Sequence, residues 1–142
     1  MSEMYDLLPH REPFLYVDRI ESVDEKQIIG YRRFTDADYF FKGHFPEYPV
    51  VPGVILIETM AQCGGAGLKK GGAAAADALF LLASVEKAKF RKQVRPGDEV
   101  KIVIENERVA GRMIKQKGRC FVGDDLAAEA SWLCLAGTKE DL

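Results

Sequence analysis

The chain has 142 residues, and its 20 basic and 22 acidic side chains leave a formal net charge of -2, which gives no indication of nucleic acid as a partner. This length suits one domain, spanning residues 1–142, that buries a sizeable core. Three cysteines are too few for a disulfide framework, and two histidines without metal-ligand spacing predict no metal site.

The first part of the chain predicts one short helix and two strands. Residues 4–8 predict a helix that Pro9 ends, and alternating apolar and polar residues predict strands over 14–23 and 27–34. The segment 35–53 holds three of the six prolines, so we expect an ordered loop there. No basic segment followed by an apolar core opens the sequence, and we therefore expect a cytoplasmic protein without a secretory signal.

A long helix is predicted from Gly53 to about Lys69. Pro52 suits its start, where a missing N–H costs nothing. Apolar residues surround the helix axis, so we expect a sheet curled around the helix instead of a helix lying on a surface. Glu58 and Gln62 interrupt the apolar run, which argues against a membrane span.

The second half of the chain predicts strands joined by short turns. Pro-Gly and Gly-Asp pairs mark the turns, and short turns favour an antiparallel meander. The fold class is therefore α+β. The predicted strands cover residues 78–90, 99–109, 112–122 and 126–136.

His44 and Glu58 are the first candidates for a chemical site. His44 lies in a Gly-His-Phe-Pro segment, and Glu58 lies in the apolar run 54–61. Burial penalises an ionised carboxylate, so a buried glutamate tends to have a raised pKa and a specific partner. A protonated carboxyl group that faces an imidazole able to accept a proton separates the acid from the base. The two residues therefore predict an acid/base centre.

Each of these residues also has a structural interpretation that the residues alone leave open. A histidine in a proline-rich loop is commonly structural or exposed, and a glutamate in a buried helix often pairs with an arginine. Gly53 also suits a plain helix start, and Gln62 also suits a core amide bonded to backbone. We interpret His10 as structural.

Several motifs in one order resemble a known family. The chain is similar to the (3R)-hydroxyacyl-[acyl-carrier-protein] dehydratases of bacterial type II fatty acid synthesis, and the resemblance covers nearly the whole chain. The motifs are Leu-Pro-His-Arg-Glu-Pro-Phe-Leu at 8–15, Phe-Phe-Lys-Gly-His-Phe-Pro at 40–46, Pro-Val-Val-Pro-Gly-Val at 49–54, Glu-Thr-Met-Ala-Gln at 58–62 and Val-Arg-Pro-Gly-Asp at 94–98.

The resemblance implies a fold, an assembly and a reaction. The fold is the hot dog, an antiparallel sheet wrapped around one long central helix. The assembly is a homodimer with each active site between two subunits, or a trimer of such dimers. The reaction removes water from a 3-hydroxyacyl thioester, carried on the phosphopantetheine of an acyl carrier protein, to give the trans-2-enoyl thioester. It requires no cofactor.

The resemblance also assigns roles to residues. It implies that His44 is the base and that Glu58, from the other subunit, is the acid or positions the water. The backbone N–H of Gly53 takes the oxyanion role, because a helix N-terminus favours an anion. Gln62 lies one turn beyond Glu58, at the i, i+4 spacing that lets it orient the carboxyl group.

A basic segment predicts where the carrier protein docks. Residues 86–95 hold five positive charges and one negative charge in an otherwise acidic chain. Such a patch speeds encounter with an acidic partner, although lysines also protect an exposed strand edge. The docking candidates are Lys87, Lys89, Arg91, Lys92 and Arg95.

Two other function classes stay open from the sequence. A hot-dog acyl thioesterase would use the same buried carboxylate to direct water at the thioester carbonyl. A non-catalytic acyl-binding relative would keep the fold and leave the chemistry to a partner. The glutamate at position 58 resembles the branch of the family that dehydrates without isomerising the double bond.

Overall fold

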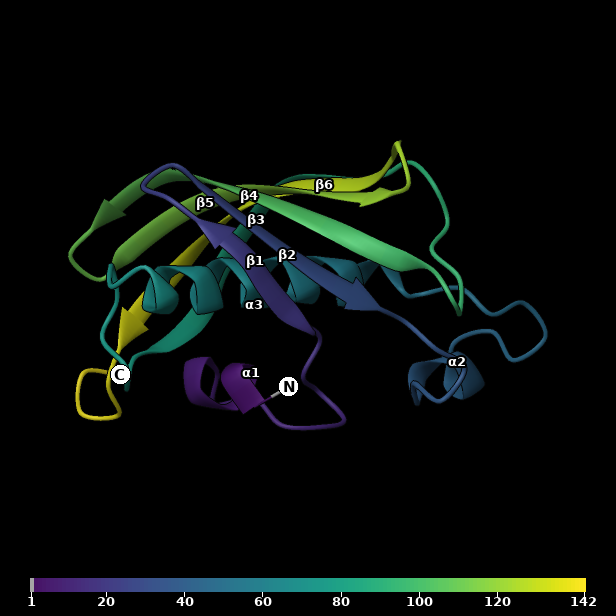
Figure 1. Cartoon of the computed structure of the whole chain (residues 1–142), viewed down its shortest axis with the longest axis horizontal. Helices are drawn as coiled ribbons and strands as arrows, with labels where there is room; N and C mark the ends of the chain where they lie inside the picture. The colour runs from purple at the N-terminus through teal and green to yellow at the C-terminus, as the bar shows by residue number, and fades with distance from the viewer. Residues whose placement is uncertain (1) are drawn as a thin grey trace.

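A six-stranded antiparallel sheet arches over one long helix in the computed structural model, which describes residues 2–142. The strands lie in the order β1-β2-β4-β5-β6-β3, and α1 lies on the side of α3 that faces away from the sheet (Figure 1). The elements are α1 (Ser2–Leu7), β1 (Arg19–Val23), β2 (Gln27–Arg33), α2 (Phe40–Gly43), α3 (Gly53–Lys70), β3 (Leu79–Phe90), β4 (Glu99–Ala110), β5 (Met113–Val122) and β6 (Asp125–Gly137).

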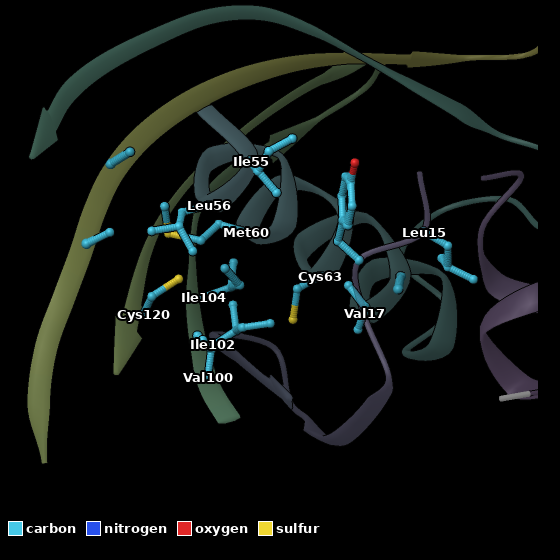
Figure 2. Packing of buried hydrophobic residues seen from close by; sticks show 14 of the residues in the cluster. Leu15, Val17, Ile55, Leu56, Met60, Cys63, Val100, Ile102, Ile104 and Cys120 are labelled. Atoms are coloured by element: carbon cyan, nitrogen blue, oxygen red, sulfur yellow. The ribbon is translucent and has the colours of Figure 1, made fainter. Parts of the chain in front are cut away.

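The helix α3 is buried on most of its circumference, as its apolar sequence predicted. Leu56 and Met60 point toward the concave face of the sheet (Figure 2). Gly64, Gly65 and Gly67 in the second half of the helix are buried against side chains of the sheet. The α+β class with a central helix wrapped by a sheet is therefore confirmed.

Strands β2, β4, β5 and β6 alternate largely between buried and more exposed residues with a period of two, whereas no residue of β3 is fully buried. Val100, Ile102 and Ile104 on β4 are fully buried, and Ile102 lies opposite Cys120 of β5. Ile28 of β2 lies opposite Ile104 on the other side. This register places a continuous apolar layer against α3.

The predicted meander is wrong for β3. Strands β4, β5 and β6 form consecutive hairpins, and their turn glycines Gly111 and Gly123 have φ of 61° and 60°. The turn at Gly97, with φ 95°, leads out of β3, but β3 pairs with β6 at the far edge while β2 pairs with β4. A Pro-Gly turn marks a change of direction without specifying which strands become neighbours.

Two local predictions also need correction. Residues 14–18 precede β1: the N–H of Tyr16 donates to the side chain of Gln62 at 2.8 Å, and only Asp18 donates to a strand, at the carbonyl of Tyr31. The loop predicted over 35–53 contains the short helix α2, anchored by buried Phe40 and Phe41. No helix within residues 2–142 is long and apolar enough to cross a membrane.

Candidate active site

His44 follows the last residue of α2 and lines the same hollow as Gly53, the first residue of α3. Its backbone N–H donates to the carbonyl of Phe40 at 2.8 Å, and its ring stacks on Phe45 with centroids 4.0 Å apart. Its Nδ1 lies 3.1 Å from the carbonyl oxygen of Val50. Because a carbonyl only accepts hydrogen bonds, this contact places the proton on Nδ1 and leaves Nε2 as a free proton acceptor.

The His44 hollow has a volume of about 660 Å³ and opens beside the first turn of α3. Gly53, the first residue of the helix, lies on its wall with the ring of Phe90 against its Cα. A Cβ at position 53 would lie 2.9 Å from that ring. Since the first N–H groups of a helix have no partner within the helix, Gly53 offers a close approach to a backbone donor.

Glu58 lies on the second turn of α3, with its side chain 24% exposed. Burial raises the pKa of its carboxyl group, and the hydrogen bond from Gln62 lowers it in part. Gln62 Nε2 donates to Glu58 Oε2 at 3.0 Å and to the carbonyl of Phe14 at 2.9 Å, and Gln62 Oε1 accepts from the N–H of Tyr16. The amide is therefore held at both ends, and it fixes one oxygen of the carboxyl group.

A second, smaller hollow of about 230 Å³ surrounds Glu58. Residues of β3 form its apolar side, and His10 and Cys134 also line it. His10 Nε2 lies 3.6 Å from Glu58 Oε2. Among residues 2–142, no arginine or lysine forms an ion pair with Glu58, in contrast to the structural interpretation of a buried glutamate.

Within one subunit, His44 and Glu58 line different hollows. Gly53 and Glu58 are five residues apart, which turns the helix by about 140° beyond one full turn and points their side chains to different sides. A single chain places Gly53 near His44, and Gln62 near Glu58. It does not bring the His44 pair and the Glu58 pair together in one hollow.

The basic residues of the segment 86–95 are distributed over different surfaces. Arg91 and Lys92 line the His44 hollow, where they pair with Glu129 and Asp125 at 2.6 Å each. The other three basic residues lie apart from one another. Arg95 lies over the ring of Tyr48. On β3, Lys89 lies opposite Glu129 of β6, and Lys87 lines a polar hollow on the sheet.

Sequence reasoning missed two parts of the site. The carbonyl of Val50, which fixes the tautomer of His44, carries no side-chain signal. The sequence also gives no indication that His10 lies beside Glu58, where the structure places it, and its structural role stays a prediction.

Comparisons with known proteins agree on one family. Residues 8–131 match the family described as FabA-like domain. The chain is 43% identical over 140 residues to the 3-hydroxyacyl-[acyl-carrier-protein] dehydratase FabZ of Desulforamulus reducens, covering 98% of each chain. It is 40% identical over 131 residues to the FabZ of Pelotomaculum thermopropionicum, covering 92% of this chain and 93% of that one.

Solved structures support the fold. The dehydratase heterocomplex ApeI:P from Xenorhabdus doucetiae superposes with a TM-score of 0.82 at 16% identity, covering 96% of this chain and 92% of that one. A probable thioesterase from Bartonella henselae gives a TM-score of 0.63 at 16% identity, covering 82% and 94%. At such identities the likeness shows the hot-dog fold alone. The sequence matches decide the family: this chain belongs to the FabA-like family and, within it, to the 3-hydroxyacyl-[acyl-carrier-protein] dehydratases named FabZ.

Proposed function

We propose that His44 and Glu58 remove water from a 3-hydroxyacyl thioester on an acyl carrier protein, in fatty acid biosynthesis. The chain is a hydro-lyase, as its FabZ relatives are. The observation that carries the assignment is a free imidazole nitrogen at His44, next to the helix start, together with a carboxyl group whose pKa is raised by burial. We place this reaction in the cytoplasm, as expected from the sequence.

The elimination divides between these groups. Nε2 of His44 takes a proton from carbon 2, and that electron pair forms the double bond to carbon 3. The C–O bond at carbon 3 breaks as Glu58 gives its proton to the departing hydroxyl, which leaves as water. The N–H of Gly53 stabilises the charge that builds on the thioester oxygen. A proton passed from His44 back to Glu58 completes the cycle.

We propose that a second copy of the chain joins the two halves of the site. Strand β3 is an edge strand, and its apolar side chains are exposed: Leu81 51%, Leu82 41%, Val85 37% and Phe90 51%. An exposed apolar edge invites pairing with another strand. Leu81 lines the Glu58 hollow, and Phe90 lines the His44 hollow. Antiparallel pairing of two β3 strands across a two-fold axis therefore sets the Glu58 hollow of one subunit beside the His44 hollow of the other.

The test of the function is formation of enoyl product from a 3-hydroxybutanoyl carrier thioester, followed by absorbance. Wild-type protein should form the enoyl thioester, and His44→Ala should lower kcat by about a hundredfold or more with the fold intact. Mass analysis of the product separates this reaction from thioester hydrolysis, which gives the free acid. Equal enoyl formation by His44→Ala would contradict the assignment.

We propose that the carrier protein docks beside the His44 hollow, on Arg91, Lys92 and Arg95, with Lys89 at its margin. The ion pairs with Glu129 and Asp125 reduce the local charge, so charge sets the rate of encounter more than the affinity. Lys87 lies in the separate polar hollow and is left out of this surface.

Charge reversal tests the docking surface. Arg91→Glu with Lys92→Glu should raise KM for the carrier-linked substrate and leave turnover of the same acyl group on free pantetheine unchanged. Lys115→Glu, on the exposed face of the inner strand β5, is the matched control, with wild-type KM expected for both substrates. An unchanged KM for the carrier-linked substrate in the double variant removes the docking proposal.

A further inference from the structure

His10 lies against Glu58, and the proposed chemistry gives it no role. It belongs to the segment between α1 and β1, and its ring stacks on Phe14 with centroids 6.4 Å apart. Its Nε2 is 3.6 Å from Oε2 of Glu58, with the two side chains 25% and 24% exposed. A ring held by stacking beside a carboxyl group is suited to orient that group.

We propose that His10 is a positioning residue for Glu58: its Nε2–H faces Oε2, so that Oε1 carries the proton that leaves for the substrate. This inference rests on the proposed function, because it requires Glu58 to be the acid. His10 acts through Glu58 and touches no reacting atom.

The choice of oxygen follows from Gln62. Its Nε2 donates to Oε2 of Glu58 at 3.0 Å, and its Oε1 accepts from the N–H of Tyr16 at 2.8 Å, which fixes the orientation of the amide. An oxygen that accepts a hydrogen bond from Gln62 and faces a second donor is the carbonyl oxygen of a neutral carboxyl group. The acidic proton therefore resides on Oε1.

The tautomer of His10 follows from its surroundings. Burial and the nearby cations Lys69 and Arg11 lower the pKa of His10, so the ring is neutral. Its Nδ1 is buried and has no hydrogen-bond partner among residues 2–142. A proton on Nδ1 would be buried without an acceptor, whereas a proton on Nε2 faces Glu58, so the Nε2–H form is favoured.

The other titratable groups that face Glu58 within the described residues are neutral. Burial raises the pKa of Cys134, on β6, to about 11. Burial and the hydrogen bond with Tyr39 raise the pKa of Tyr16 as well. The β3 side of the hollow is apolar, with Phe80, Leu81 and Leu82. When Glu58 gives up its proton, the Nε2–H of His10 and the amide of Gln62 are the dipoles placed to stabilise the new charge.

Three substitutions of His10 test this role. His10→Phe keeps the ring and the stacking on Phe14 but removes the N–H. His10→Gln places an amide N–H at the reach of Nε2, whereas His10→Asn places one at the reach of Nδ1, too short to face Oε2. Thermal unfolding and light scattering check that each variant keeps the fold and the assembly.

The expected result is a change in kcat and in its pH profile. His10→Phe and His10→Asn should lower kcat by about tenfold with little change in KM, and His10→Gln should recover most of it. The alkaline limb, where Glu58 ionises, should move to higher pH in His10→Phe, because loss of a donor disfavours the carboxylate. Wild-type kcat and an unmoved limb in His10→Phe overturn the inference. Should His10→Phe fail to fold, equal kcat for His10→Gln and His10→Asn overturns it.

Glu58→Gln separates the two proposals. If Glu58→Gln keeps the wild-type rate, the proposed function fails, and the inference about His10 fails with it. If Glu58→Gln abolishes turnover and His10→Phe keeps both kcat and the limb, only the role of His10 fails. Adding His10→Phe to Glu58→Gln should lower the residual rate little further, because the two residues act as one unit.

Discussion

At Glu58, the proposed acid of the reaction, burial of the side chain costs the folded chain stability. Burial raises its pKa above the ordinary value of 4.5, so the folded state holds the proton more tightly than the unfolded state. Between 4.5 and the raised pKa the folded chain binds more protons, and stability therefore falls as pH rises through that window. Below 4.5 both states are protonated and the cost disappears.

Glu58→Gln is therefore expected to raise the thermal midpoint at neutral pH, because the amide has no charge to desolvate, while enoyl formation is lost. This increase in the thermal midpoint should vanish at a pH well below 4.5, where both states of the wild-type chain are protonated. Calorimetric scans of the wild type and of Glu58→Gln across pH measure the difference in midpoint. A pH-independent difference in the midpoint would show that burial of charge is not its source.

Gln62→Leu should have two effects, one on stability and one on the pH profile. Loss of the amide leaves the N–H of Tyr16 and the carbonyl of Phe14 without their partner, at about 1–3 kcal/mol for each buried group. The pKa of Glu58 should rise further, because the bond from Gln62 lowers it. Urea unfolding measures the first effect, and the alkaline limb of kcat measures the second.

Gln116→Leu is the matched control for Gln62→Leu. Gln116 is a buried amide on β5, where it accepts from Trp132 Nε1 at 3.2 Å and donates to Asn106 at 2.8 Å, in a network separate from Glu58. Its removal should also destabilise the chain but leave the alkaline limb in place. A limb that moves equally in both variants would count against the specific effect of Gln62.

The sequence predicts some residue contacts of the site and not others. The spacing of Glu58 and Gln62 places them on one helix face, and the hydrogen bond between them follows from helix geometry alone. The contacts of His10 with Glu58 and of His44 with Val50 join a loop to other segments. The periodicity of the sequence does not predict such contacts, because they depend on how the loops pack against the folded sheet and helix.

At the scale of elements, α3 lies so close to the sheet that it leaves no room for side chains at its glycines. A Cβ at Gly67 would meet Ile28 of β2, with its Cδ1 at 2.6 Å. Gly67→Ala should therefore lower stability by about 1–3 kcal/mol, although alanine favours a helix. Gly43 has nothing within 4 Å of its Cβ position, so Gly43→Ala should change urea unfolding little. Equal stability of the two variants would contradict the close packing of α3.

Element types were predictable because burial imposes a period on each segment. The helix at 53–70 and the strands β2, β4, β5 and β6 follow their apolar patterns closely, whereas β1 begins five residues later than its pattern predicts. The place of β3 was not predictable, since an edge strand and an inner strand with similar side chains differ only in their neighbours. The crossover through α3 sets that order, and it leaves no local mark in the sequence.

At the scale of the whole molecule, the proposed dimer has a sharp consequence for mixed subunits. His44→Ala and Glu58→Ala homodimers should both be inactive. Unfolding and refolding them together in equal amounts produces mixed dimers, in which one of two sites holds both His44 and Glu58. Activity should return to about a quarter of the wild-type value for statistical mixing in a two-fold dimer.

The control for subunit mixing is refolding each variant alone, which should give no activity. A mixture that stays inactive although light scattering shows dimers would place His44 and Glu58 of the same chain in one site.

The close packing of α3 against the sheet bears on the coupling between the two active sites of the proposed dimer. In the proposed dimer, Gly53 of each α3 belongs to one site and Glu58 of the same helix belongs to the other. One helix therefore connects the two sites. Gly64 and Gly67 pack against Gln116 and Ile28, which anchors the part of the helix beyond Glu58 to the sheet. An acyl group that displaces the N-terminal end of α3 at one site is expected to shift the carboxyl group of Glu58 at the other site. Binding of the second substrate molecule is then expected to depend on binding of the first.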